Sequence, residues 1–214
     1  MSLKIAYFQP TVICIDNVPP VEFSKMHILT EDLHGRHELN DSDNPFISIR
    51  GGNQVQIFPN EINIDVSWLL KYIKSICQGY MDIITQQSGT DDLKLCDIEI
   101  VSAWTIRQGA GDYQEMHTHP VGNISGNIYI AAPELNEGSQ PSDSQILFRL
   151  PQTRDVNRFM MTDTWKYSPT PGTVLIFPSH IPHTVYPWKG TGHRTILAFD
   201  ARLRPKEELF GGKS

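Results

Sequence analysis

The chain has 214 residues, of which 39% are hydrophobic and 20% are charged, and its formal net charge is −6. This length and composition predict one globular domain, with or without an N-terminal elaboration, and exclude a largely disordered chain. The negative charge, without any run of lysines or arginines, argues against a nucleic-acid-binding protein and against an anionic membrane surface as a partner.

Cysteine usage and the absence of targeting signals predict a cytoplasmic protein. Cys14, Cys77 and Cys96 are odd in number and far apart, which fits reduced thiols better than a disulfide framework or a Cys-x-x-Cys metal site. No basic segment precedes an apolar core at the N-terminus, and no apolar run nears the roughly 18 residues that cross a bilayer. A homodimer is one option for the assembly of the chain.

The N-terminal part of the chain predicts a mixture of strands and helices. Residues 5–15 are rich in β-branched and aromatic side chains and predict a strand that ends before the loop at 17–20. Residues 21–33 carry apolar side chains at roughly helical spacing, which favours a short helix. After a turn at 51–53, residues 55–58 predict another strand.

A second helix is predicted more strongly than any other element. It begins with Asp65 or Ser67 as N-cap, and its apolar stripe from Trp68 to Ile84 must pack against a sheet.

Three histidines lie in the first part of the chain, at positions 27, 34 and 37. Their neighbours in the sequence are polar. We interpret His27, His34 and His37 as solvated surface side chains without a role in metal binding.

Beyond residue 95 the sequence changes to short β-rich runs that are separated by turns. These runs are 98–106, 124–132, 144–150, 173–177 and 195–200. Such spacing is typical of an all-β unit. We therefore expect residues 1–95 to form an N-terminal strand and helix elaboration packed on a core at 96–205, with helices backing a β-barrel-like sandwich, and 206–214 to form a flexible tail.

The β-rich part carries a metal-binding pattern. His117 and His119 are two residues apart, so their side chains point to the same side if the segment is a strand. The turn at Pro171-Gly172 leads into the strand at 173–177, which delivers His183 as a third ligand. Neutral imidazoles are favoured ligands of iron, zinc, copper and nickel, and three of them leave open positions on the ion.

Arg194 follows the third histidine, and a hairpin through residues 189–192 could bring its guanidinium beside the imidazoles. His180 is expected at the pocket mouth or in solvent, and His193 is expected to point away from the site.

This order of residues resembles the iron(II)- and 2-oxoglutarate-dependent oxygenase superfamily over about residues 98–203. The segments 125–130 and 171–179, followed by 183–185, are similar to a poorly characterised bacterial and phage branch of it. The resemblance implies a mainly β protein with a double-stranded β-helix, also called a jelly roll and similar to the cupin fold, supported by N-terminal strands and helices.

The resemblance also implies an activity and its cofactors. The protein would be a dioxygenase that uses Fe(II), dioxygen and 2-oxoglutarate to hydroxylate a small-molecule or peptidyl substrate. His117 and His183 would bind iron, Arg194 would hold the distal carboxylate of 2-oxoglutarate, and Tyr129 would donate a further hydrogen bond to it. No catalytic side chain is predicted beyond the metal site.

Two features depart from the superfamily pattern. His119 stands where an aspartate or glutamate usually completes a triad of two histidines and one carboxylate, so the ion would be one unit more positive. Many relatives carry a hydroxyl residue two places after the arginine, whereas here Thr195 comes one place after it and should face the wrong side.

Two alternatives remain open. The glycine, proline and histidine spacing also resembles three-histidine cupins that use no 2-oxoglutarate, although the glutamate usual in cupins is absent here and His180 replaces a usual glycine. A non-catalytic β-helix binding module is a third hypothesis. Arg194 discriminates between the oxygenase and the cupin, because an oxygenase requires it to point inward and a cupin leaves it free at the surface. Trp104, Gln114 and Asn127 are candidates for the substrate pocket.

Overall fold

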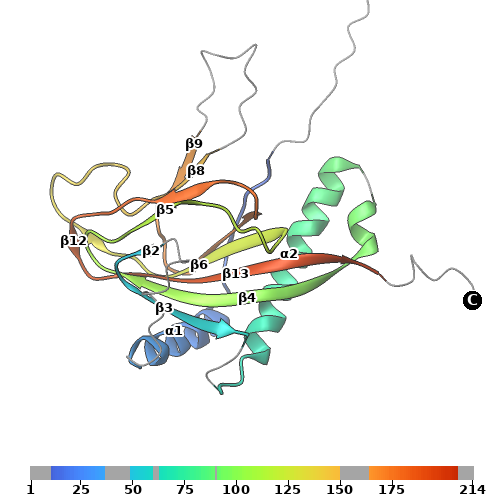
Figure 1. Ribbon diagram of the computed structural model, residues 1–214, viewed down its shortest axis with the longest axis horizontal. Helices are drawn as coiled ribbons and strands as arrows, with labels where there is room; N and C mark the ends of the chain where they lie inside the picture. The colour runs from blue at the N-terminus through green and yellow to red at the C-terminus, as the bar shows by residue number, and fades with distance from the viewer. Residues whose placement is uncertain (1–10, 37–48, 60–62, 90, 150–163, 207–214) are drawn as a thin grey trace, which may run out of the picture.

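Two antiparallel β-sheets form the centre of the protein (Figure 1). The computed structural model describes residues 11–36, 49–59, 63–89, 91–149 and 164–206. Among these residues, the larger sheet has six strands in the spatial order β1 (Cys14–Asn17), β10 (Thr173–Pro178), β6 (Ile124–Ala131), β13 (Arg194–Pro205), β4 (Cys96–Gln108) and β3 (Asn53–Phe58). The smaller sheet has five, in the order β2 (Ile49–Arg50), β5 (Tyr113–His117), β11 (His183–Val185), β8 (Ile146–Arg149) and β9 (Thr164–Tyr167).

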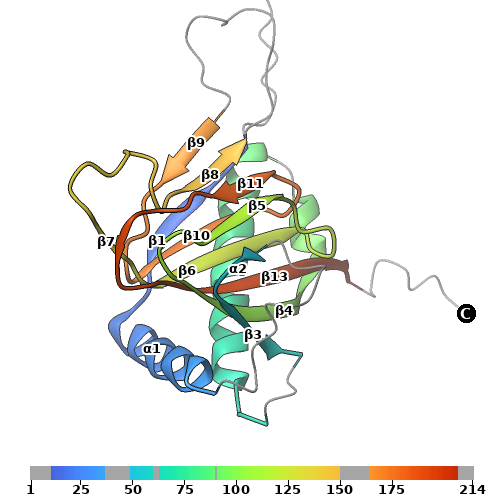
Figure 2. The same ribbon diagram turned by 60° about the vertical axis from the view of Figure 1, so that its left-hand side comes forward.

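The chain alternates between the two sheets. Strands β4, β6, β10 and β13 belong to the larger sheet, and β5, β8 and β11, which lie between them in the sequence, belong to the smaller one. A short additional pair, β7 (Glu134–Leu135) and β12 (Gly190–Thr191), joins the loops at one end. This alternation produces the predicted jelly roll, and Figure 2 shows the smaller sheet lying across the larger one.

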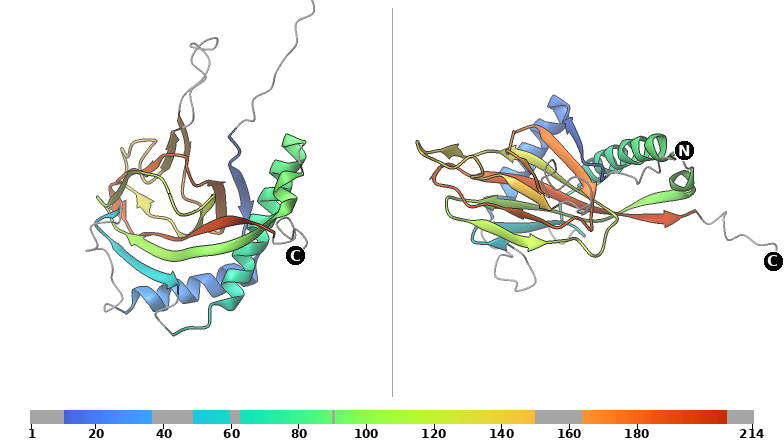
Figure 3. Two further views of the ribbon diagram at one scale, coloured as in Figure 1. Left: turned by 45° about the vertical axis from the view of Figure 1, so that its right-hand side comes forward. Right: turned by 90° about the horizontal axis from the view of Figure 1, so that it is seen from above.

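Two helices cover the outer face of the larger sheet (Figures 1 and 3). Helix α1 (Pro20–His34) confirms the prediction for residues 21–33, and α2 (Ser67–Ser88) confirms the long amphipathic helix. The N-cap of α2 is Val66, not Asp65 or Ser67 as predicted. The Asp65 carboxylate nevertheless accepts a hydrogen bond from the Ser67 backbone N–H at 2.9 Å, so it satisfies one free donor of the first turn.

The larger sheet separates two apolar cores. Its outer face contributes side chains such as Leu197 and Phe199 to a core shared with both helices, whereas its inner face contributes Ile196 and Ala198 to a core between the sheets. Gly126 of β6 lies opposite Phe199 in the register, and a Cβ at Gly126 would overlap the Phe199 ring. A glycine is therefore required at this point of the outer core.

The predicted elements differ from the observed ones mainly at their ends. Strand β1 covers residues 14–17 and so enters the segment predicted as a loop, while residues 5–10 of the predicted strand lie outside the described residues. Strand β8 begins two residues later than predicted, and Leu150 also lies outside the described residues. Residues 207–214 of the predicted tail are likewise not described. Within the described ranges, neither helix has the length and hydropathy that crossing a membrane requires.

The prediction that His34 is a solvated surface side chain is wrong. His34 ends α1 and is only 7% exposed, because it points toward the larger sheet and its Nε2 lies 3.0 Å from the Thr105 hydroxyl. His27, one of the two other histidines, is exposed as predicted, and His37 lies outside the described residues.

Candidate metal centre

Three imidazoles converge between the two sheets. His117 ends β5, His183 begins β11 and is its partner in the register, and His119 follows β5 by two residues. One ring nitrogen from each lies within 4.8 Å of the others. The convergence of His117 and His119 was predicted on the assumption that both lie on one strand, but His119 lies outside β5. Its backbone N–H instead donates a hydrogen bond to the Ser179 carbonyl at 2.9 Å, and this contact holds it beside the other two.

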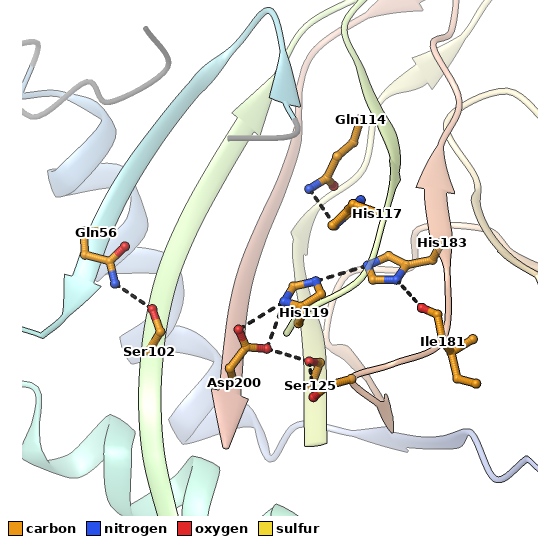
Figure 4. Close-up of polar contacts among 10 residues, drawn as sticks. Gln56, Ser102, Gln114, His117, His119, Ser125, Ile181, His183 and Asp200 are labelled. Atoms are coloured by element: carbon orange, nitrogen blue, oxygen red, sulfur yellow. Dashed lines mark hydrogen bonds and ion pairs between the residues drawn. The ribbon is translucent and has the colours of Figure 1, made fainter. Parts of the chain in front are cut away.

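The Nδ1 atom of each imidazole lies at hydrogen-bond distance from an oxygen acceptor, and Figure 4 shows these contacts for His119 and His183. His117 Nδ1 lies 2.7 Å from the Glu115 carbonyl oxygen, and His183 Nδ1 lies 2.9 Å from the Ile181 carbonyl oxygen. His119 Nδ1 lies 2.9 and 3.1 Å from the two oxygens of Asp200. Because these oxygens can only accept, each Nδ1 carries the proton of the ring and each Nε2 keeps a free lone pair.

The free nitrogens are arranged as a cation requires. His119 Nε2 and His183 Nε2 lie 3.3 Å apart, so two lone pairs face each other without a hydrogen between them. His117 Nε2 lies 3.2 Å from the side-chain amide of Gln114. A divalent ion bound by all three Nε2 atoms would remove this repulsion, so the residues fit a transition metal that prefers imidazole.

Burial keeps the ligands ready for a metal. Desolvation lowers the pKa of His117 to about 4, and it lowers the pKa of His183 well below the ordinary value of 6.5, with the neighbouring histidines adding to the effect. Both rings are therefore neutral at pH 7, which is the protonation state that binds metal.

His119 has a more elaborate environment than the other two. Its ring stacks on Trp104, with ring centroids 5.6 Å apart, and its Nδ1 faces the Asp200 carboxylate. The Ser125 hydroxyl donates a hydrogen bond to Asp200 at 2.5 Å, and the Ser179 hydroxyl lies 2.8 Å from that of Ser125. Since Ser125 gives its only hydrogen to Asp200, Ser179 must donate to Ser125.

Arg194 points inward, as the oxygenase interpretation requires and the cupin interpretation does not. Its side chain is only 2% exposed, and its guanidinium donates a hydrogen bond to the side-chain oxygen of Gln108 and packs over the Trp188 ring at 5.8 Å. Its Nε has no partner, and no carboxylate pairs with it in the part of the chain that the structure describes. Burial lowers its pKa to about 10, so it stays charged at pH 7.

This buried cation fits an anionic ligand. Asp112 is close enough to raise the pKa of Arg194 but does not form an ion pair with it. A buried guanidinium without an ion-pair partner is costly, and its planar fork suits a carboxylate that comes from outside. Tyr129, also buried, lies close enough to Arg194 for the two groups to influence each other's pKa. Desolvation raises the pKa of Tyr129, so its phenol keeps the proton that a hydrogen bond to a carboxylate needs.

One strand supplies both ends of this arrangement. Arg194, Ile196, Ala198 and Asp200 alternate along the inner face of β13, and the ends of this row are about 20 Å apart along the extended chain. Thr195 faces the opposite side, where its hydroxyl accepts a hydrogen bond from Arg107 at 3.3 Å. The prediction that the Thr195 hydroxyl faces away from the inner side is therefore confirmed.

The remaining predicted residues lie around the same space. Trp104 and Asn127 are both register partners of Ala198, so they flank this small side chain on the inner face, and Gln114 is buried beside His117. His180 and His193 are exposed, as predicted.

Sequence reasoning missed Asp200, Gln108, Ser125 and Ser179. A signal existed for Asp200, because it lies an even number of residues from Arg194 in one β-rich run.

Comparisons with known proteins agree with this geometry. Residues 102–200 match the family described as "Putative 2OG-Fe(II) oxygenase". A Pseudomonas putida prolyl-4-hydroxylase shares 18% identity and a TM-score of 0.58, with 92% of this chain and 94% of that chain covered. The viral collagen prolyl hydroxylase of Paramecium Bursaria Chlorella virus-1, solved with 2OG, shares 14% identity and a TM-score of 0.54 over 88% and 94% of the two chains.

A third solved structure is also similar. It is a Trichoplax adhaerens prolyl hydroxylase in complex with a peptide fragment of a hypoxia inducible factor oxygen degradation domain, with 16% identity, a TM-score of 0.54, and coverage of 94% and 87%. At these identities the structures establish a shared fold. No curated protein matches the chain by sequence.

Proposed function

We propose which residues of this oxidoreductase bind its iron and its cosubstrate. The proposal starts from the match of residues 102–200 to the 2-oxoglutarate- and iron(II)-dependent oxygenase family. His117, His119 and His183 hold the iron, and Arg194 and Tyr129 hold the distal carboxylate of 2-oxoglutarate. The observation that carries the proposal is the presence of three ring nitrogens within 4.8 Å of one another together with a buried guanidinium that has no carboxylate at ion-pair distance among the described residues.

The chain's own contribution is to bind, orient and exclude water. The three Nδ1 contacts fix the tautomer and orientation of each ring, so the rings need no rearrangement before the ion binds, and only the Gln114 amide, 3.2 Å from His117 Nε2, must move aside. Gln108 restrains the Arg194 fork, and the inner core around Ile196 and Tyr129 keeps water away from it. Iron and 2-oxoglutarate, when bound, supply the oxidising chemistry that hydroxylates the substrate with dioxygen and releases succinate and carbon dioxide.

The substrate is proposed to bind over Trp104, Asn127 and Gln114, which lie beside the histidines. Met116 and Val121, each 49% exposed, are close in sequence to His117 and His119 and offer apolar surface near the site. A peptidyl substrate is supported by the Trichoplax adhaerens neighbour, which was solved with a peptide fragment, and a small molecule is the alternative. Succinate release stimulated by proline-containing peptides and not by free amino acids would favour the peptide.

The proposed location is the cytoplasm. Cys14, Cys77 and Cys96 are all free thiols, which suits a reducing compartment, and iron(II) also persists better there. Labelling of the three thiols in intact cells would test this, because oxidised cysteines would contradict it.

The assignment of iron and cosubstrate residues is tested by titrating 2-oxoglutarate into iron(II)-loaded protein without oxygen, followed by the visible charge-transfer absorption. The band should saturate in the wild type, and Arg194→Gln should need at least about tenfold more 2-oxoglutarate, because a charged hydrogen-bonded anchor is lost. Arg204→Gln is the matched control, since Arg204 lies on the same strand, is exposed and pairs with Glu99.

The other outcomes identify the alternatives. Iron binding without any band would favour a three-histidine cupin that does not use 2-oxoglutarate. Failure of the wild type to bind iron, with His119→Ala no different, would favour a non-catalytic module.

A further inference from the structure

Asp200 is a buried carboxylate without a cationic partner. It is 4% exposed, and it is the only aspartate or glutamate buried in the part of the chain that the structure describes. No lysine or arginine pairs with it there. Its ionisable partner is the His119 ring, which carries a positive charge only when both ring nitrogens are protonated. Burying such a charge is costly, so its presence points to a cation that comes from outside the chain.

The Asp200 carboxylate lies on one side of the His119 ring, and the proposed metal position lies on the other. Both of its oxygens lie within hydrogen-bond distance of His119 Nδ1, at 2.9 and 3.1 Å, and the opposite nitrogen of the same ring faces His183 Nε2 (Figure 4). The order carboxylate, imidazole, metal position is therefore built into the site. Such outer carboxylates raise the basicity of a ligating imidazole.

Other side chains fix the position of Asp200. Ser125 is its register partner on β6 and donates a hydrogen bond to Oδ1 at 2.5 Å, while Ser179 supports Ser125. A carboxylate held in this way keeps its second oxygen directed at His119.

Only one of the three imidazoles has a charged partner. His117 and His183 donate to backbone carbonyls, which carry no net charge, whereas His119 donates to a carboxylate. Non-haem iron(II) oxygenase centres commonly combine two histidines with one carboxylate ligand. Here the single negative charge lies one ring further from the ion, behind His119.

We propose that His119 and Asp200 act as one unit, in which Asp200 is a positioning residue that supplies the metal centre with the negative charge that a directly bound carboxylate would bring. This inference rests on the proposed function. It predicts that metal binding needs one negative charge, which either a carboxylate at position 200 behind His119 or a carboxylate at position 119 itself can supply.

The test measures Co(II) affinity of the apoprotein by competition with a chelator, in the wild type, Asp200→Asn, His119→Asp and the double variant. Asp200→Asn should weaken Co(II) binding by about 10 to 100-fold, because the amide removes the charge and turns an N–H toward His119 Nδ1. His119→Asp should also weaken binding, since two carboxylates then face each other. The double variant should bind Co(II) more tightly than either single variant. Asp97→Asn, an exposed aspartate on β4, is the matched control.

Thermal unfolding of the apoprotein separates this role from a structural one. Without metal, the amide of Asp200→Asn can accept from Ser125 and donate to His119 Nδ1 once the ring proton moves to Nε2, so the Tm should change by less than about 3 °C. If the variant does not fold, Ser125→Ala replaces it, because loosening the carboxylate should weaken Co(II) binding by about tenfold.

Three outcomes decide the matter. A double variant that binds Co(II) more tightly than either single variant supports the proposal. The proposal is overturned if the losses of Co(II) affinity caused by Asp200→Asn and His119→Asp multiply in the double variant. It is also overturned if Asp200→Asn or Ser125→Ala binds Co(II) as tightly as the wild type. A wild type that binds neither Co(II) nor iron(II) would instead refute the proposed metal centre, so the two failures are distinguishable.

Discussion

Lowering the pH from 7 to 5 should destabilise the apoprotein through His34. Its Nε2 lies 3.0 Å from the Thr105 hydroxyl, which itself donates to the Ile196 carbonyl at 2.8 Å. The hydroxyl must therefore accept from the ring, and His34 Nδ1 is buried without a partner. Burial, followed by the positive charge of Arg107, lowers the pKa of His34 to about 4.

The size of the effect follows from proton linkage. The unfolded chain takes up a proton on His34 near its ordinary pKa of 6.5, whereas the folded chain does so only near 4. Between these values the unfolded state binds more protons, so the free energy of unfolding falls as the pH falls. A shift of this size implies a loss of about 2 kcal/mol between pH 7 and pH 5.

Urea unfolding of chelator-treated protein at the two pH values measures this loss. His34→Gln keeps a donor for Thr105 but cannot titrate, and His27→Gln is the matched control because His27 is exposed on the same helix. The wild type and His27→Gln should lose about 2 kcal/mol more than His34→Gln. The titrating imidazoles of the metal centre are common to all three proteins and cancel. An equal loss in His34→Gln and the wild type would refute the reasoning.

Two further predictions concern the core and the metal. Gly126→Ala should lower the free energy of unfolding by at least about 2 kcal/mol, because its Cβ would overlap the Phe199 ring and lie 2.8 Å from the Leu175 carbonyl oxygen. Urea unfolding measures this loss. An unchanged free energy of unfolding would mean that the Phe199 ring can move aside. Chelating the metal from loaded protein should lower the Tm by roughly 5 to 10 °C, since at 100 times Kd a ligand of the native state contributes about 2.7 kcal/mol. A Tm that does not respond to chelation would contradict a metal centre at the three histidines.

Much of the fold could be predicted because its long elements have strong periodicity. The apolar stripe of α2 and the β-rich runs that became β4, β6, β10 and β13 carry the pattern in their own residues. The short strands β2, β7 and β12 could not be predicted, because two residues contain no periodicity and their pairing depends on neighbours distant in the sequence.

The ligand set was predictable, and its support was not. The His-x-His spacing and the distal histidine are local patterns, whereas the contact of His119 with Ser179 joins two loops far apart in the sequence. His34 was misjudged from its polar neighbours, although it lies four and eight residues after Thr30 and Met26, both buried on the same face of α1. Helical spacing was therefore the better guide to its burial.

The position of Arg194 and Asp200 on one face of one strand has a consequence for folding. A slip of β13 by one residue against β4 and β6 would turn Thr195, Leu197 and Phe199 inward and send both site residues toward the helices. The cosubstrate anchor and the charge behind His119 would be lost together. An incompletely paired sheet thus lacks both ends of the site at once, and the centre that handles dioxygen is complete only when the native strand register has formed.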